Sequence, residues 1–220
     1  MGFKINNLTY EYSSGFKLYN ISLSVKPGET LKINGNNGSG KTTLLRTIAG
    51  LKELKSGTIT YNGKNITNDL EVKGETFAYL GHLNGINDNL TVGQNLKFWF
   101  DIYREPETQI LKTFKIENIV NRKVSDCSVG QKRLVGLVRI FNSQKKILLL
   151  DEPTASLDEE NKKLVVEQIN KHKKNGGFSI IISHDKFPSE KLITLKYDPK
   201  NDSSTLDSIV NPSSKPKAMS

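Results

Sequence analysis

The chain has 220 residues, 35% of them hydrophobic, which is enough for one sizeable buried core. Its formal net charge is +9, but the basic residues are spread along the chain, which favours a solvated surface over a nucleic-acid footprint, so no nucleic-acid partner is expected. No apolar run approaches the roughly 20 residues of a membrane span, the N-terminus lacks the apolar segment of a secretory signal, and the single cysteine cannot form an internal disulfide, so we expect a cytosolic protein.

Alternating and β-branched runs dominate the first third of the chain. They cover residues 3–12, 17–25, 29–35 and 57–66, and turn sequences such as KPGE separate them. These runs predict antiparallel strands around a central strand, which leads into a glycine-rich loop at Gly35. Residues 42–51 then show the apolar spacing of a helix.

Helical and strand patterns alternate in the rest of the chain. A strand is predicted at 75–81, Thr91 and Gln94 form a capping-box pattern that begins a helix, and the segment from about 83 to 137 is predicted to be helical. The continuous apolar runs ILLL and FSIII are typical of strands buried on both faces of a parallel sheet. The fold class is therefore predicted to be α/β, with a mostly parallel sheet, an N-terminal antiparallel β subdomain and an inserted α-helical subdomain.

We expect one domain over residues 1–197. The remaining segment, residues 198–220, is polar and is interrupted by Pro199, Pro212 and Pro216. Such a composition lacks the apolar surface that would offset the entropy of ordering the chain. The tail is therefore predicted to be disordered.

The segment GNNGSGKT matches the complete P-loop pattern G-x-x-x-x-G-K-[ST]. Its glycines allow successive backbone N–H groups to face an anion, and the following helix directs the positive end of its dipole toward phosphate groups. Lys41 is expected to reach the β- and γ-phosphate oxygens, and the Thr42 hydroxyl suits Mg²⁺. The loop thus predicts a site for a nucleoside triphosphate in a P-loop NTPase core. Its predicted binding residues are Gly35, Asn36, Asn37, Gly38, Ser39, Gly40, Lys41, Thr42 and Thr43.

Two further apolar strands end in residues that suit phosphoryl transfer. Asp151 comes at the end of KKILLLDEP, where an open α/β sheet presents its ligands, and is expected to hold Mg²⁺. Glu152 follows as the candidate general base for an attacking water. His184 ends the run FSIIISH, and would reach the γ-phosphate if its strand lies beside that of Asp151; otherwise it is a surface histidine.

These elements, in this order, resemble the ATP-binding subunits of ABC transporters over nearly the whole chain to about Asp185. DCSVGQKR, residues 126–133, stands where that family has its signature motif, and Ser156, Leu157 and Asp158 stand at its D-loop. Tyr12 resembles the aromatic residue that stacks on adenine, with Tyr10 as the less favoured alternative. The resemblance implies an ATPase that uses ATP and Mg²⁺.

In that family two subunits close head to tail, and each signature motif caps the ATP of the other subunit. The resemblance implies a homodimer in which Ser128, Gly130 and Gln131 contact the γ-phosphate in trans. Cys127 and Val129 depart from the usual Leu-Ser-Gly-Gly-Gln. The family also places a glutamine where this chain has His82, a candidate catalytic residue that would add a protonation near pH 6.5.

That histidine and the stretch YLGHLNGINDNLTVGQNLKFW are similar to the ATP-binding subunit of the cytochrome c maturation system, described as a haem exporter. The similarity implies integral membrane transporter subunits as partners. It also implies a peripheral position on the cytoplasmic face of a bacterial inner membrane, or on the matrix face of a mitochondrial inner membrane. The alternatives are another small ABC exporter, such as one for lipid or peptide, a soluble ABC ATPase acting on nucleic acid, and a non-enzymatic regulator. The intact Lys41, Asp151, Glu152 and His184 argue against the last of these.

The aromatic residues of the predicted helix 91–103 leave two roles open. Phe98, Trp99, Phe100 and Tyr103 could form a groove for a coupling helix of a membrane subunit, or they could be core residues. Both roles are retained, with Trp99 predicted to pack inside.

Overall fold

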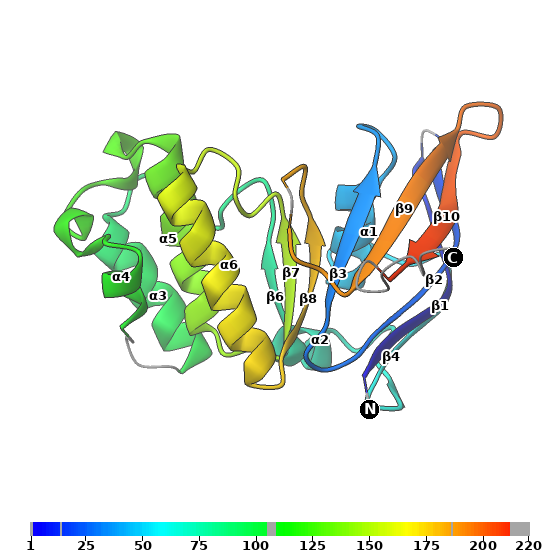
Figure 1. The fold of residues 1–220 in the computed structure, drawn as a ribbon, viewed down its shortest axis with the longest axis horizontal. Coiled ribbons are helices and arrows are strands. Elements are labelled where there is room, and N and C mark those ends of the chain that lie inside the picture. The colour runs from blue at the N-terminus through cyan, green and yellow to red at the C-terminus, as the bar shows by residue number, and fades with distance from the viewer. Residues whose placement is uncertain (1, 14, 105–108, 186, 212–220) are drawn as a thin grey trace, which may run out of the picture.

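The fold was taken from a computed structural model of the chain, and Figure 1 shows its arrangement. The structure describes residues 2–13, 15–104, 109–185 and 187–211. Within these ranges no helix is both long and apolar enough to cross a membrane. The polypeptide forms one ten-stranded sheet, flanked by helices, with strand order β5-β4-β1-β2-β10-β9-β3-β8-β7-β6.

The strands divide into a parallel half and an antiparallel half. β9, β3, β8, β7 and β6 are parallel neighbours, whereas β1, β2, β4 and β5 pair antiparallel. This is the predicted combination of a parallel core and an antiparallel subdomain. The strands are β1 (Phe3–Glu11), β2 (Lys17–Val25), β3 (Thr30–Gly35), β4 (Ser56–Tyr61), β5 (Lys64–Asn65), β6 (Phe77–Leu80), β7 (Ile147–Asp151), β8 (Phe178–Ile182), β9 (Lys191–Asp198) and β10 (Ser203–Val210).

Most of the helices gather beside the β6 end of the sheet, as Figure 1 shows for α3, α4, α5 and α6. Capping boxes begin two of them, since Thr91 and Ser128 each accept a hydrogen bond from the backbone N–H of the glutamine three residues later. The helices are α1 (Lys41–Ile48), α2 (Leu70–Thr76), α3 (Val92–Tyr103), α4 (Ile110–Thr113), α5 (Val129–Asn142) and α6 (Glu159–Lys174), with 3-10 turns at Glu117–Ile119 and Val124–Asp126.

The parallel strands are buried on both faces and separate two hydrophobic clusters. Leu148 and Leu150 of β7 belong to a cluster with α3, α5 and α6, whereas Ile147 and Leu149 belong to a cluster with α1 and the antiparallel strands. Successive side chains of a strand point to opposite faces, so an unbroken apolar run is needed here. Because β7 and β8 are buried on both faces, the polar residues of the site begin only where these strands end.

The prediction of a disordered tail from residue 198 is wrong for most of the described part of that segment. Ser203–Val210 forms β10, which pairs antiparallel with β9 along its length and parallel with β2 at Ser203 and Ser204. Backbone hydrogen bonds order this polar strand, so its side-chain composition does not indicate that it forms a strand. Residues 212–220 of the predicted tail lie outside the described residues.

Candidate nucleotide-binding site

The P-loop connects β3 to α1 and needs glycine at its turns. Gly38 and Gly40 have φ angles of 81° and 84°, in the left-handed region that favours glycine. A Cβ on Gly35 would lie 2.5 Å from Ser39 Oγ and 2.6 Å from the carbonyl oxygen of Leu195. The loop can therefore wrap tightly because its glycines lack side chains.

Lys41, at the start of α1, closes this loop. Its Nζ donates to the carbonyl oxygens of Gly35 at 2.8 Å and Asn36 at 3.0 Å. Burial lowers the pKa of the Lys41 ammonium, and the carboxylates of Glu152 and Asp151 act in the opposite direction. The ammonium thus lies within the loop, close to two carboxylates, where an anionic ligand can replace its carbonyl contacts.

Thr42 and Asp151 meet although 109 positions separate them. Thr42 Oγ1 donates to Asp151 Oδ2 at 2.7 Å. Within the described parts of the chain, no group of three or more His, Cys, Asp or Glu side chains could hold a metal ion. One carboxylate and one hydroxyl suit Mg²⁺, because this ion keeps several waters and takes phosphate oxygens as further ligands. Both predicted metal ligands therefore fit that role.

Glu152 and His184 form a pair at the ends of neighbouring strands. β7 and β8 are parallel with Asp151 opposite Ile182, as the prediction for His184 requires. The His184 backbone N–H donates to Glu152 Oε2 at 3.2 Å, and its ring Nε2 lies 3.6 Å from Glu152 Oε1. Glu152 Oε1 is buried and has no hydrogen-bond partner among the residues that the structure describes. Because a buried carboxylate oxygen without a partner is costly, Glu152 is ready to accept a proton or a hydrogen bond from a ligand.

One pocket of about 470 Å³ joins these parts of the site. Tyr12 lines it, whereas Tyr10 is 9% exposed and does not, which favours Tyr12 as the residue that faces a nucleotide. Phe16 also lines the pocket and was not predicted from the sequence. The feature that indicates it is its aromatic side chain shortly after Tyr12. Predicted residues that the pocket brings together are Tyr12, Asn37, Gly38, Gly40, Lys41, Thr42, Thr43, Asp151, Glu152 and His184. Gly35 and Asn36 line an adjoining pocket that shares Lys41 and His184.

The predicted signature residues lie outside that pocket. Ser128 caps α5 by accepting from Gln131 N, and Gln131 Oε1 accepts from Ser128 N. A Cβ on Gly130 would lie 2.8 Å from the carbonyl oxygen of Ser156, so this glycine allows the predicted D-loop to pack on the start of α5. Asp158 caps α6 through Asn161 N at 2.8 Å.

His82 also lies apart from the pocket. It is exposed in the loop between β6 and α3, next to Leu83, which is 79% exposed. Within one chain the structure therefore brings together the phosphate loop, both carboxylates and His184, but not His82 or the signature residues.

Arg133 is a second residue whose importance the sequence did not reveal. Its side chain, on α5, is buried, and burial lowers its pKa to about 10, so the guanidinium is still charged at neutral pH. It donates to the carbonyl oxygens of Gly81, Asp151 and Glu152 and to Asn84 Oδ1. One side chain thus connects α5, the loop after β6 and the end of β7.

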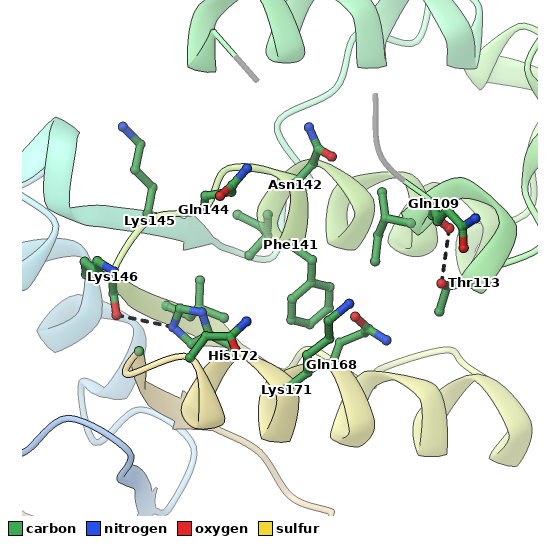
Figure 2. A pocket seen from close by; sticks show the side chains of 15 residues that line it. Gln109, Thr113, Phe141, Asn142, Gln144, Lys145, Lys146, Gln168, Lys171 and His172 are labelled. Carbon is green, nitrogen blue, oxygen red and sulfur yellow. Dashed lines mark hydrogen bonds between the residues drawn. The ribbon is translucent and has the colours of Figure 1, made fainter. Parts of the chain in front are cut away.

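A separate pocket of about 390 Å³ lies at the other end of β7, between α4, α5 and α6. Figure 2 shows Phe141 in its centre and the His172 ring directed at the backbone oxygen of Lys146, which lies 3.2 Å from Nε2. Lys146 precedes β7, whereas Asp151 ends it. This pocket is therefore not part of the phosphate site.

Comparison with known proteins agrees with the site. The family model described as ABC transporter matches residues 18–155. The chain is 35% identical over 188 residues to the cytochrome c biogenesis ATP-binding export protein CcmA of Legionella pneumophila (strain Lens), which covers 84% of this chain and 93% of that protein. It is 32% identical over 200 residues to the protein of the same name from Vibrio parahaemolyticus serotype O3:K6 (strain RIMD 2210633), covering 88% and 98%.

The fold is also similar to that of a solved ATP-binding cassette. The dimeric structure of MJ0796 in a post-hydrolysis state, bound to ADP and Pi, superimposes with a TM-score of 0.83 at 23% identity, covering 95% of this chain and 98% of that one. The predicted α/β class with a P-loop NTPase core is confirmed. The chain belongs to the ABC transporter family and, within it, to the group of the cytochrome c biogenesis ATP-binding export proteins.

Proposed function

We propose that the chain binds ATP with Mg²⁺ and hydrolyses it as the ATP-binding subunit of a haem-export complex in cytochrome c biogenesis. The observation that carries the ATPase assignment is the meeting of the P-loop, Asp151, Glu152 and His184 in one pocket. The relatives named as cytochrome c biogenesis ATP-binding export proteins support the biological role. We place the subunit on the cytoplasmic face of a bacterial inner membrane, or on the matrix face of a mitochondrial inner membrane.

Each catalytic side chain has a distinct task in this mechanism. The P-loop N–H groups and Lys41 hold the β- and γ-phosphates, and Thr42 and Asp151 would hold Mg²⁺. When bound, Mg²⁺ supplies positive charge to the phosphate oxygens. Glu152 Oε1 accepts a proton from a water whose oxygen attacks the γ-phosphorus, while ADP leaves. His184 contacts the transferred phosphate and orients Glu152.

A homodimer completes the site in this proposal. Ser128 and Val129 are exposed at the start of α5, away from the pocket of their own chain, and Val129 is 68% exposed. A helix N-terminus is suited to contact phosphate, so Ser128, Gly130 and Gln131 of one subunit would close over the γ-phosphate held by the other. Val129 would lie at the same contact. The dimeric state of the MJ0796 cassette supports this arrangement.

Lys41→Ala is expected to weaken ATP binding by about 10- to 100-fold, because one charge-assisted contact to phosphate is worth roughly 1.5–3 kcal/mol. Titration calorimetry with ATP and Mg²⁺ measures the change. Lys4→Ala, which removes an exposed lysine on β1, is the matched control and is expected to bind like wild type. Equal affinity of the Lys41→Ala and wild-type proteins would contradict the phosphate-binding role.

The exposed apolar surface on α3 is the proposed contact with a membrane subunit. Phe98 and Ile102 are 55% and 52% exposed, and because they are four positions apart they share one face of the helix. Trp99 is instead half-buried, and its Nε1 donates to the carbonyl oxygen of Gly85 at 2.8 Å. We therefore propose that the aromatic residues of this helix divide between the two roles left open by the sequence. Leu83 lies on the loop that Trp99 anchors.

Phe98→Asp is expected to abolish recovery of membrane subunits with the ATPase from detergent-solubilised native membranes, because it places a charge in an apolar contact. Mass spectrometry of the purified material is the measurement, and ATP affinity should be unchanged. Lys97→Asp, one position away and exposed, is the control. Recovery of ribosomes or DNA with the wild-type protein, without a membrane protein, would contradict the transport role.

A further inference from the structure

We propose that Phe16 forms a second wall of the nucleobase site and that Tyr197, on the C-terminal β9–β10 hairpin, is the positioning residue that holds it there. This inference rests on the proposed ATP-binding function. It assigns a role to a hairpin whose second strand, β10, the sequence did not predict. The ligand group that it concerns is the planar base of the nucleoside triphosphate.

Phe16 lies between Tyr12, which forms the first wall of the nucleobase site, and the phosphate loop. Its ring centroid is 5.9 Å from that of Tyr12, and the two ring planes are inclined at 59°. A Cβ on Gly40 would lie 2.8 Å from Phe16 Cζ, so the ring lies directly against the last glycine of the loop. A base joined to phosphates in this loop would therefore have Phe16 within reach.

Tyr12 is a fixed wall because its ring and hydroxyl already have partners. Its hydroxyl lies 2.9 Å from Thr43 Oγ1, the ammonium of Lys52 lies 4.7 Å from the ring centroid, and the edge-on ring of Tyr10 lies 4.9 Å away. The carbonyl oxygen of Phe16 accepts from Tyr12 N at 2.8 Å, which holds the backbone of the turn, but the Phe16 side chain has no polar group to hold its ring in place. The position of the Phe16 ring therefore depends on contacts with other parts of the fold.

Tyr197 supplies such a contact. Its ring stacks on Phe16 with a centroid distance of 6.1 Å and an interplanar angle of 25°. Its hydroxyl donates to Asp202 Oδ1 at 2.8 Å, and the carbonyl oxygen of Asp202 accepts from Lys17 N at 2.9 Å. The hairpin thus holds the Tyr197 ring and the backbone next to Phe16 together.

The same hairpin also borders the phosphate loop. β9 pairs with β3 so that Leu195 lies opposite Gly35, the first glycine of the loop. Tyr197 follows two positions later on β9. One strand therefore contacts both the start of the phosphate loop and the second aromatic wall, and holding an aromatic residue in place before binding lowers the entropy lost when a ligand stacks on it.

The test compares ATP with inorganic tripolyphosphate, which has phosphates but no base, by titration calorimetry on the full chain. Phe16→Ala is expected to weaken ATP binding about 10-fold, the size of one base–aromatic stack, and tripolyphosphate binding less than about twofold. Tyr197→Ala should weaken ATP selectively by about threefold, because Phe16 remains but is less well held. Tyr197→Phe, which keeps the ring, should restore most of the affinity.

Tyr19→Ala is the control, because Tyr19 is an exposed tyrosine on β2 outside the pocket. A melting curve for each variant establishes that it is folded, and Tyr197→Leu replaces Tyr197→Ala if the latter unfolds. Equal losses for ATP and tripolyphosphate, or unchanged ATP affinity in both Phe16→Ala and Tyr197→Ala, would overturn the inference while leaving ATP binding in place. A wild-type chain that binds neither ligand would overturn the proposed function itself.

Discussion

Glu152→Gln is expected to lower ATP hydrolysis by about 10²- to 10⁴-fold, the usual contribution of a general base, while ATP binding is kept. The amide has the size of the carboxylate and can still accept from the His184 backbone N–H, but it cannot take a proton from water. ATP that is bound but not hydrolysed should hold the proposed dimer closed. Phosphate release measures turnover, and size-exclusion chromatography with ATP and Mg²⁺ measures dimer formation.

The matched control for this variant is Glu75→Gln, which makes the same chemical change at an exposed position on α2. It should hydrolyse ATP at the wild-type rate and should not accumulate a dimer. Equal turnover by Glu152→Gln and wild type would remove Glu152 from the role of base. In that case the buried oxygen without a partner would need another explanation.

Arg133→Met is expected to destabilise the protein by about 3 kcal/mol or more, because it removes the donor from four buried or partly buried acceptors. For a chain of this size each kcal/mol lowers Tm by roughly 2–4 °C, so a decrease of about 6–12 °C is expected. Turnover should fall as well, since two of the acceptors are the backbone oxygens of Asp151 and Glu152. Differential scanning calorimetry and phosphate release measure the two effects.

Arg122→Met provides the comparison for that prediction. Arg122 is exposed, and its replacement should change the free energy of unfolding by less than about 0.5 kcal/mol. If Arg133→Met melted at the same temperature as Arg122→Met, the four contacts of Arg133 would carry no net stability. Arg133→Lys separates charge from geometry, because lysine keeps the charge but cannot reproduce the planar set of donors.

The parts of the fold that the sequence predicted are those set by neighbouring residues. The capping box at Thr91 depends on a spacing of three positions and is confirmed, and the structure has a second one of the same spacing at Ser128. The unbroken apolar runs of β7 and β8 required burial on two faces, and the structure has it. The strand β10 was missed because its order comes from backbone pairing, with β9 in a hairpin and with the distant β2 at two positions, and not from an apolar pattern.

The sequence by itself determined the chemistry of the site. The P-loop and the residues at the ends of β7 and β8 can be read from short stretches, because an open α/β sheet presents its ligands at the carboxyl ends of its strands. Only the tertiary structure decided which distant residues support them. Arg133 reaches Asp151 and Glu152, and Tyr197 reaches Phe16, through contacts between segments that local spacing does not relate. The tertiary structure also placed Ser128 outside the pocket of its own chain, since the direction of α5 depends on how it packs against the sheet.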